Sequence, residues 1–193
     1  MIKNVINFMR DRLKKALPKN SLEEPQAELF VYVESDKEDS TSFKSEAVSI
    51  LLVRIEEETS LRQPDPYVRT SAKGAHQKVA PEIQLNLWVL FVARFKDYPE
   101  SLQHLSDVIR YFQNHRVFNQ ENSPDLNVGV SQLILELVTP SFSEQNEIWG
   151  MLRSAYQPSA LYKVKMIVFR DEDGQPLTPI TELIQTTTQE PAR

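Results

Sequence analysis

Residues 139–170 read TPSFSEQNEIWGMLRSAYQPSALYKVKMIVFR, and they predict a helix, a tight break and a long strand. Ser141 and Glu144 have the spacing of a capping box, which begins a helix. The apolar residues that follow recur at helical spacing and should share one face: Phe142, Trp149, Leu152 and Tyr156. After Pro158 the period changes to two, with Tyr162, Val164, Met166 and Val168 on one side and Lys163 and Lys165 on the other. The stretch therefore predicts a helix packed beside a strand, and it contains no reactive group.

The rest of the chain predicts two more helices and four more strands. Residues 1–17 read MIKNVINFMRDRLKKAL, with apolar residues at helical spacing and cations near the end, where the helix dipole favours them. This pattern favours a helix packed on the domain over a secretion signal or a membrane-surface helix. Strands are expected at residues 27–34, 47–58, 81–95 and 130–139, with a polar turn at 119–127. The other helix should lie on the sheet through Tyr98, Leu102, Leu105, Ile109 and Phe112.

The order helix, three strands, helix, strand, helix, strand predicts an α+β fold, a mixed α/β layer with helices packed on a four- to five-stranded sheet. A chain of 193 residues fits one domain, which we place at residues 1–170. Residues 171–193 are polar and should form a flexible tail. Residues 59–80 show no period, and we expect a long loop of the kind that is usually functional or disordered.

Composition excludes several kinds of site. The chain has no cysteine, so disulfides and cysteine-ligated metals are excluded. The net charge of −5 argues against nucleic acid as the main partner. None of the four glycines lies in a phosphate-binding loop, and no segment is apolar and long enough to span a bilayer. We therefore expect no cofactor, and a membrane is not an expected partner.

The histidines and acidic runs give no strong prediction of chemistry. His104 and His115 on the second helix lack the spacing of a metal pair, and we expect structural roles for both. His76 lies in the long loop, where a catalytic base would need a nucleophile beside it. Residues 171–174 read DEDG and resemble part of a calcium loop, but the early glycine favours a simple turn. No catalytic or metal-binding residue is therefore predicted.

Two exposed segments are candidates for partner contact. Glu56, Glu57 and Glu58 form an acidic run at a strand end, typical of a solvated edge or a salt-bridge surface. The loop that follows carries a basic and aromatic set, which in an acidic chain favours protein docking over nucleic acid: Arg62, Tyr67, Arg69 and Lys73. Trp88 and Trp149 are most simply core residues, although a tryptophan at a ring interface would give the same sequence pattern.

Three blocks together resemble a known family. They are LLVRIEEETSLRQ at residues 51–63, EIQLNLWVLFVARF at 82–95 with the helix after it, and TPSFSEQNEIWGMLRSAYQPSALYKVKMIVF at 139–169. These blocks resemble the N-terminal domain of the tube-terminating (cap) proteins of phage-tail-like extracellular contractile injection systems. The last block, with Thr-Pro, a helix ending near Trp and Tyr, and then Pro-Ser and a Tyr-x-Val strand, is the most specific.

The resemblance implies a phage tail-terminator-like fold and a structural, non-enzymatic role. It implies a homo-hexameric ring on the distal end of the inner tube, which stops tube growth and contacts the last layer of sheath protein. Such a protein would assemble in the cytoplasm and then belong to a particle that is released from the cell or anchored to a membrane. Two other functions are considered from the residues: a small-molecule enzyme that uses His76 with loop carboxylates, and an adaptor that binds a partner through residues 1–17.

Overall fold

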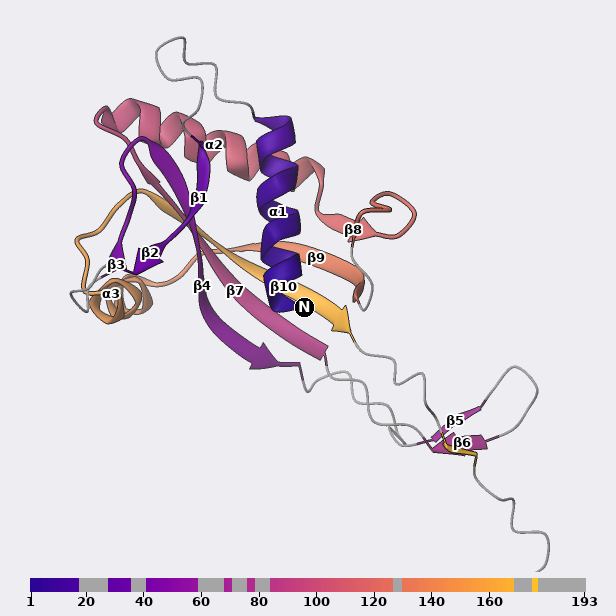
Figure 1. Ribbon diagram of the computed structural model, residues 1–193. Helices are drawn as coiled ribbons and strands as arrows, with labels where there is room; N and C mark the ends of the chain where they lie inside the picture. Colours follow the sequence, from indigo (N-terminus) through magenta and orange to yellow (C-terminus); the bar gives the residue numbers. More distant parts are fainter. Residues whose placement is uncertain are drawn as a thin grey trace, which may run out of the picture. The chain divides into compact units, whose positions relative to one another are not determined.

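The computed structural model describes residues 1–17, 28–35, 41–58, 68–70, 76–78, 84–126, 130–168 and 175–176. The chain forms two compact units, residues 1–60 with 83–169 and residues 61–82 with 170–193. The first unit contains the main sheet and the three described helices (Figure 1). The second contains a small three-stranded sheet.

The main sheet has six strands in the order β1-β4-β7-β10-β9-β8. Their bounds are Phe30–Tyr32 (β1), Ala47–Glu57 (β4), Gln84–Arg94 (β7), Ser159–Val168 (β10), Val130–Val138 (β9) and Val117–Asn119 (β8). β1 runs parallel to β4, and all other neighbours in this sheet are antiparallel. The five strands expected from the sequence are all found. β8 raises the sheet above the expected four or five strands, because a three-residue strand is too short to show an alternation in sequence.

Short strands also occur where a loop and a tail were expected. β2 (Glu34–Ser35) pairs with β3 (Thr41–Ser42) in the first unit. In the second unit, β5 (Val68–Thr70) pairs with β6 (His76–Lys78), and β6 pairs with β11 (Gln175–Pro176). The expected loop at residues 59–80 therefore contains a hairpin, and two residues of the expected tail complete its sheet. The remaining residues of that loop and tail lie outside the described part of the chain.

One face of the main sheet is covered by α1 (Ile2–Ala16) and α2 (Tyr98–Asn114). Helix α1 buries five apolar side chains, Val5, Ile6, Phe8, Met9 and Leu13, which confirms the prediction that it packs on the domain. They meet strand residues that alternate along the sheet, including Leu87, Val89 and Phe91 of β7 and Tyr162, Val164 and Met166 of β10. This larger core confirms the period-two pattern of β10.

The other face is covered in part by α3 (Phe142–Met151). Its start confirms the predicted capping box: the Ser141 N–H donates to Glu144 Oε2 at 2.8 Å, and the Glu144 N–H donates to Ser141 Oγ at 3.3 Å. Trp149 and Leu152 then pack on a smaller core with Phe43, Leu90, Val92 and Leu161.

Four residues expected to face the sheet are exposed instead. Phe142 is 92% exposed, and Tyr156 follows the end of α3 and is also exposed. Tyr98 and Leu102, in the first turns of α2, are exposed as well. Helical spacing gives the direction of a side chain around its helix but not how far the sheet extends beneath that helix. The expectation was therefore wrong for the ends of these two helices.

Candidate functional site

The part of the sheet that α3 leaves uncovered carries a row of charged and polar side chains. Leu90 and Val92 of β7 lie in the smaller core under α3. Farther along the same face, Trp88 packs partly against this core, and Asn86 is buried, with 1% of its surface exposed. Strand register places polar neighbours on both sides of them, since Asn86 pairs with Glu56 and Lys165, and Lys163 pairs with Trp88. We call this surface the polar half-face and define it by seven residues: Glu56, Glu58, Asn86, Trp88, Glu136, Lys163 and Lys165.

Trp88 lies near the middle of the polar half-face. Its indole Nε1 donates to Glu56 Oε2 at 2.9 Å. The Lys163 Nζ and the Arg54 guanidinium carbon lie 5.7 Å and 6.0 Å from the centroid of the indole ring, within the range of cation–π attraction. Trp149 is a core residue as expected, but Trp88 is only partly buried and has cations near its ring. Its alternation with Gln84 and Asn86 along β7 was the sequence signal for this position.

The acidic groups of the polar half-face already have donors. Asn86 Nδ2 donates to Glu58 Oε2 at 3.0 Å, and Lys165 Nζ donates to Glu136 Oε1 at 2.9 Å. A β-bulge between Leu52 and Arg54 shifts the register of β4 against β7 just before these contacts. The groups are arranged as pairs across neighbouring strands rather than aimed at one point. Such an arrangement suits a surface that meets another surface better than it suits a small-molecule site.

The structure brings together part of the predicted partner-contact set. Glu56 and Glu57 end β4, Glu58 follows directly, and the first and last of these belong to the polar half-face while Glu57 is exposed. Arg69 lies in β5 of the second unit. Arg62, Tyr67 and Lys73 lie outside the described residues. Four members of the surface were not predicted from the sequence, because cross-strand neighbours are set by register: Asn86, Glu136, Lys163 and Lys165.

The helix histidines are held by local contacts. The His104 ring stacks on Phe95 with centroids 4.4 Å apart, and its Nε2 lies 3.7 Å from Glu100 Oε1. The His115 ring stacks on Tyr111 at 4.5 Å, and its Nδ1 lies 3.0 Å from the Tyr111 carbonyl oxygen. These contacts fit the structural roles expected for both.

Most of the other residues considered for catalysis or metal binding have side chains outside the described part of the structure. His76 lies in β6, and its side chain is outside the described part of the structure, as are residues 171–174. Among the side chains that the structure does describe, no group of three or more histidine, aspartate or glutamate residues is placed to hold a metal ion. None of the described helices combines the length and hydropathy needed to cross a bilayer.

Comparison with known proteins gives one family and two similar structures. The family model of the Pvc16 N-terminal domain matches residues 4–182. One similar solved structure is the sheath/tube terminator of an extracellular contractile injection system, PVC, in the extended state, with a TM-score of 0.58 and 20% identity. The other is the tube-terminating cap of the anti-feeding prophage, with a TM-score of 0.55 and 19% identity. No curated protein sequence matches the chain.

Coverage differs between the chain and these two structures. The alignments include 100% and 96% of this chain but only 65% and 60% of the terminator and the cap, respectively. The chain thus spans about two thirds or less of their length. At these identities the likeness establishes the fold, and it confirms the tail-terminator-like architecture predicted from the sequence.

Proposed function

Because the chain belongs to the Pvc16 N-terminal domain family, we propose that it is a structural cap that ends the inner tube of a contractile injection system. The observation that carries the proposal is the family match over residues 4–182, together with a terminator-like fold that extends over the whole chain. The proposed partners are further copies of the chain, the inner tube protein and the last layer of sheath protein. The proposed particle assembles in the cytoplasm and is then released or held at a membrane.

The proposed cap is a homo-hexameric ring. A ring of identical subunits needs a head-to-tail interface whose rotation closes, and an interface that does not close would give a filament. A terminator must also avoid offering a new edge for growth. Most of the main sheet's edge supports this requirement, because the edge strands β1 and β8 contain only three residues each, and the part of β4 beyond β1 carries a bulge and charged residues.

The polar half-face is the proposed contact surface in the described part of the first unit. Its acidic side chains already have hydrogen-bond donors, so a partner would gain specificity by matching hydrogen bonds in register rather than by burying apolar area. The acidic run Glu56, Glu57 and Glu58 ends at this surface. We propose the same role for the basic and aromatic set Arg62, Tyr67, Arg69 and Lys73, which rests on the sequence alone.

Electron microscopy of negatively stained particles tests the proposal directly. Particles assembled without this chain should have tubes of uncontrolled length or sheaths without a closed end, and supplying the chain should restore a narrow length distribution. Glu57→Lys should weaken the restoration if the acidic run makes contact, whereas Glu121→Lys, an exposed charge reversal in the turn after β8, should restore length fully. An unchanged length distribution in the absence of the chain would contradict the proposal.

Solution measurements separate the cap from the two other functions. The proposed role is non-catalytic, and the pairwise arrangement of the polar half-face supports it. If His76→Ala abolished a measured turnover while leaving assembly intact, the enzyme would replace the cap as the better explanation. An adaptor that binds through residues 1–17 loses support because the apolar side of α1 is buried in the larger core. The purified chain should form ring-sized particles in light scattering as its concentration rises.

A further inference from the structure

Strand β9 has an open edge next to its last residues. β8 pairs with β9 only over Gln132–Ile134, and the next backbone bond runs from the Leu135 N–H to the Arg116 carbonyl oxygen at 2.9 Å. Backbone groups of alternate residues point to the same side of an antiparallel strand, so Leu137 also directs its N–H and C=O to this edge. Among the described residues, no strand pairs with Leu137 on that side. Edges of this kind bind extended peptides by continuing the hydrogen-bond ladder.

The opposite edge of the sheet is less suited to pairing. β1 covers β4 only at Val48–Ile50, which leaves the second half of β4 at the edge. That half contains the bulge before Arg54 and the charged residues Glu56 and Glu57. Bulges and charges are devices that discourage added strands. The short edge at Leu137 has no bulge, and Leu137, whose backbone groups face outward there, is uncharged and 51% exposed.

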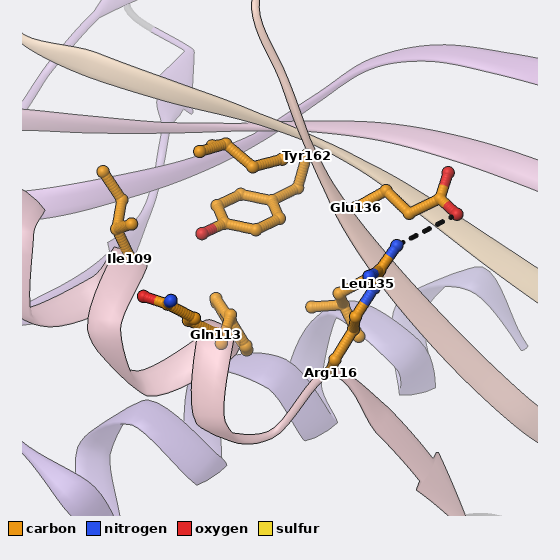
Figure 2. A pocket seen from close by; sticks show the side chains of 8 residues that line it. Ile109, Gln113, Arg116, Leu135, Glu136 and Tyr162 are labelled. Atoms are coloured by element: carbon orange, nitrogen blue, oxygen red, sulfur yellow. Dashed lines mark ion pairs between the residues drawn. The ribbon is translucent and has the colours of Figure 1, made fainter.

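A pocket lies beside this edge, between the end of α2 and strands β9 and β10 (Figure 2). Its volume is about 470 Å³, enough for one large side chain. Its walls combine apolar side chains with polar groups, and the Tyr162 hydroxyl is directed into it. Its lining residues include Ile109, Phe112, Gln113, Leu135, Leu137 and Tyr162. Because directly opposed residues of neighbouring strands place their side chains on the same face, a residue added opposite Leu137 would point into this pocket.

Arg116 supplies a cation at the rim of the pocket. Its Nη2 lies 3.5 Å from Glu136 Oε1 (Figure 2). The same oxygen accepts a closer hydrogen bond from Lys165 Nζ at 2.9 Å. The Glu136 charge is therefore balanced mainly by Lys165. The Arg116 side chain is 62% exposed, so its guanidinium can donate hydrogen bonds to a second carboxylate without breaking a buried ion pair.

We propose that this site binds the carboxyl-terminal segment of a partner protein. The segment runs antiparallel to β9, exchanges backbone hydrogen bonds with Leu137, places an apolar penultimate side chain in the pocket, and pairs its terminal carboxylate with Arg116. An added strand must stop at Arg116, because the backbone of Arg116 occupies the place opposite Leu135. The charge of Arg116 then decides which end of the segment lies there. A carboxyl terminus at that point meets a cation, whereas an amino terminus would bring two positive charges together.

A peptide pair tests the proposal without knowledge of the natural partner, and it is independent of the capping function. The probe is fluorescein-Ser-Thr-Ser-Leu-Thr with a free carboxyl terminus, compared with the same peptide carrying a terminal amide. Fluorescence anisotropy should show about fivefold tighter binding of the free acid, as expected for one exposed charge-assisted contact. The Leu137 amide should shift in nitrogen–proton NMR spectra of the full chain.

Variants of the protein separate the Arg116 contact from general charge effects. Arg116→Gln should abolish the preference for the free acid, while Arg110→Gln, which removes a comparably exposed cation from α2, should preserve it. Leu137→Asp should weaken both peptides by placing a charge at the mouth of the pocket. Equal binding of acid and amide, no binding of either, or equally tight binding of a peptide with only an internal acidic residue would each overturn the proposal.

Discussion

Replacing Phe112 with alanine should remove the residue that joins α2 to the middle of the main sheet. Phe112 is 1% exposed, and its ring centroid lies 5.3 Å from that of Tyr162 and 5.6 Å from that of Phe91. Truncating a buried phenylalanine to alanine costs about 3–5 kcal/mol of unfolding free energy. Part of that cost comes from aromatic pairs, each worth about 0.5–1.5 kcal/mol beyond the area they bury.

The open pocket beside Phe112 favours the lower part of this range. Phe112 lines the pocket, so the space left by its ring would join an existing opening rather than form a sealed cavity. Neighbouring side chains can then relax toward the space, which reduces the cavity contribution. We expect a loss of about 3–4 kcal/mol. With a urea m-value of about 2 kcal/mol/M, the unfolding midpoint should fall by about 1.5–2 M.

Urea unfolding followed by far-ultraviolet circular dichroism measures this loss, with Phe142→Ala as the matched control. Phe142 is 92% exposed, so its truncation should change the unfolding free energy by less than about 0.5 kcal/mol. The two variants delete the same atoms from helices of the same unit and differ only in burial. Similar midpoint shifts for both, or a loss below about 1 kcal/mol for Phe112→Ala, would refute the packing that places α2 on this core.

Three further predictions concern titration, capping and a helix glycine. Burial raises the pKa of Tyr162 from 10.0 to about 12, so the folded state keeps a proton that the unfolded state loses. The free energy of unfolding should therefore fall as pH rises from 10 to 12, and urea titrations should show a shallower fall for Tyr162→Phe. Ser141→Ala should destabilise the chain by about 1 kcal/mol in the same assay because it removes the side-chain cap of α3, whereas Ser143→Ala, two residues later, should be close to neutral. Gly150→Ala should stabilise the chain by about 0.5–1 kcal/mol, because an added Cβ meets nothing within 4 Å and alanine is favoured over glycine in a helix. A lowered thermal midpoint would contradict this prediction.

Sequence patterns predicted the long elements because each carries its own periodicity. The alternation of Tyr162, Val164 and Met166 placed β10 in the core, and the spacing of Ser141 and Glu144 gave the start of α3. These signals are local, since a strand or helix must turn its apolar side chains toward one layer whatever that layer is. The family resemblance rested on the same blocks, and the match over residues 4–182 confirms it.

Short strands and surface membership were not predictable in the same way. β8 has three residues and gains its strand identity only by pairing with β9. Glu136 and Lys165 are 29 residues apart and meet because two antiparallel strands have one register. The sequence favoured a core position for Trp88, which is only partly buried, since nothing in β7 itself says where α3 ends above it.

The amino-acid sequence by itself determined which residues form the helices and long strands, which face of each is apolar, and which family the chain belongs to. Tertiary structure alone decided that α3 covers only part of its face of the sheet, so that Trp88 and the charged side chains around it stay partly exposed, and that β9 extends past β8. The physical reason is range: periodicity and capping depend on neighbours within a few positions. Coverage and register instead depend on where distant segments stop, which no single segment encodes.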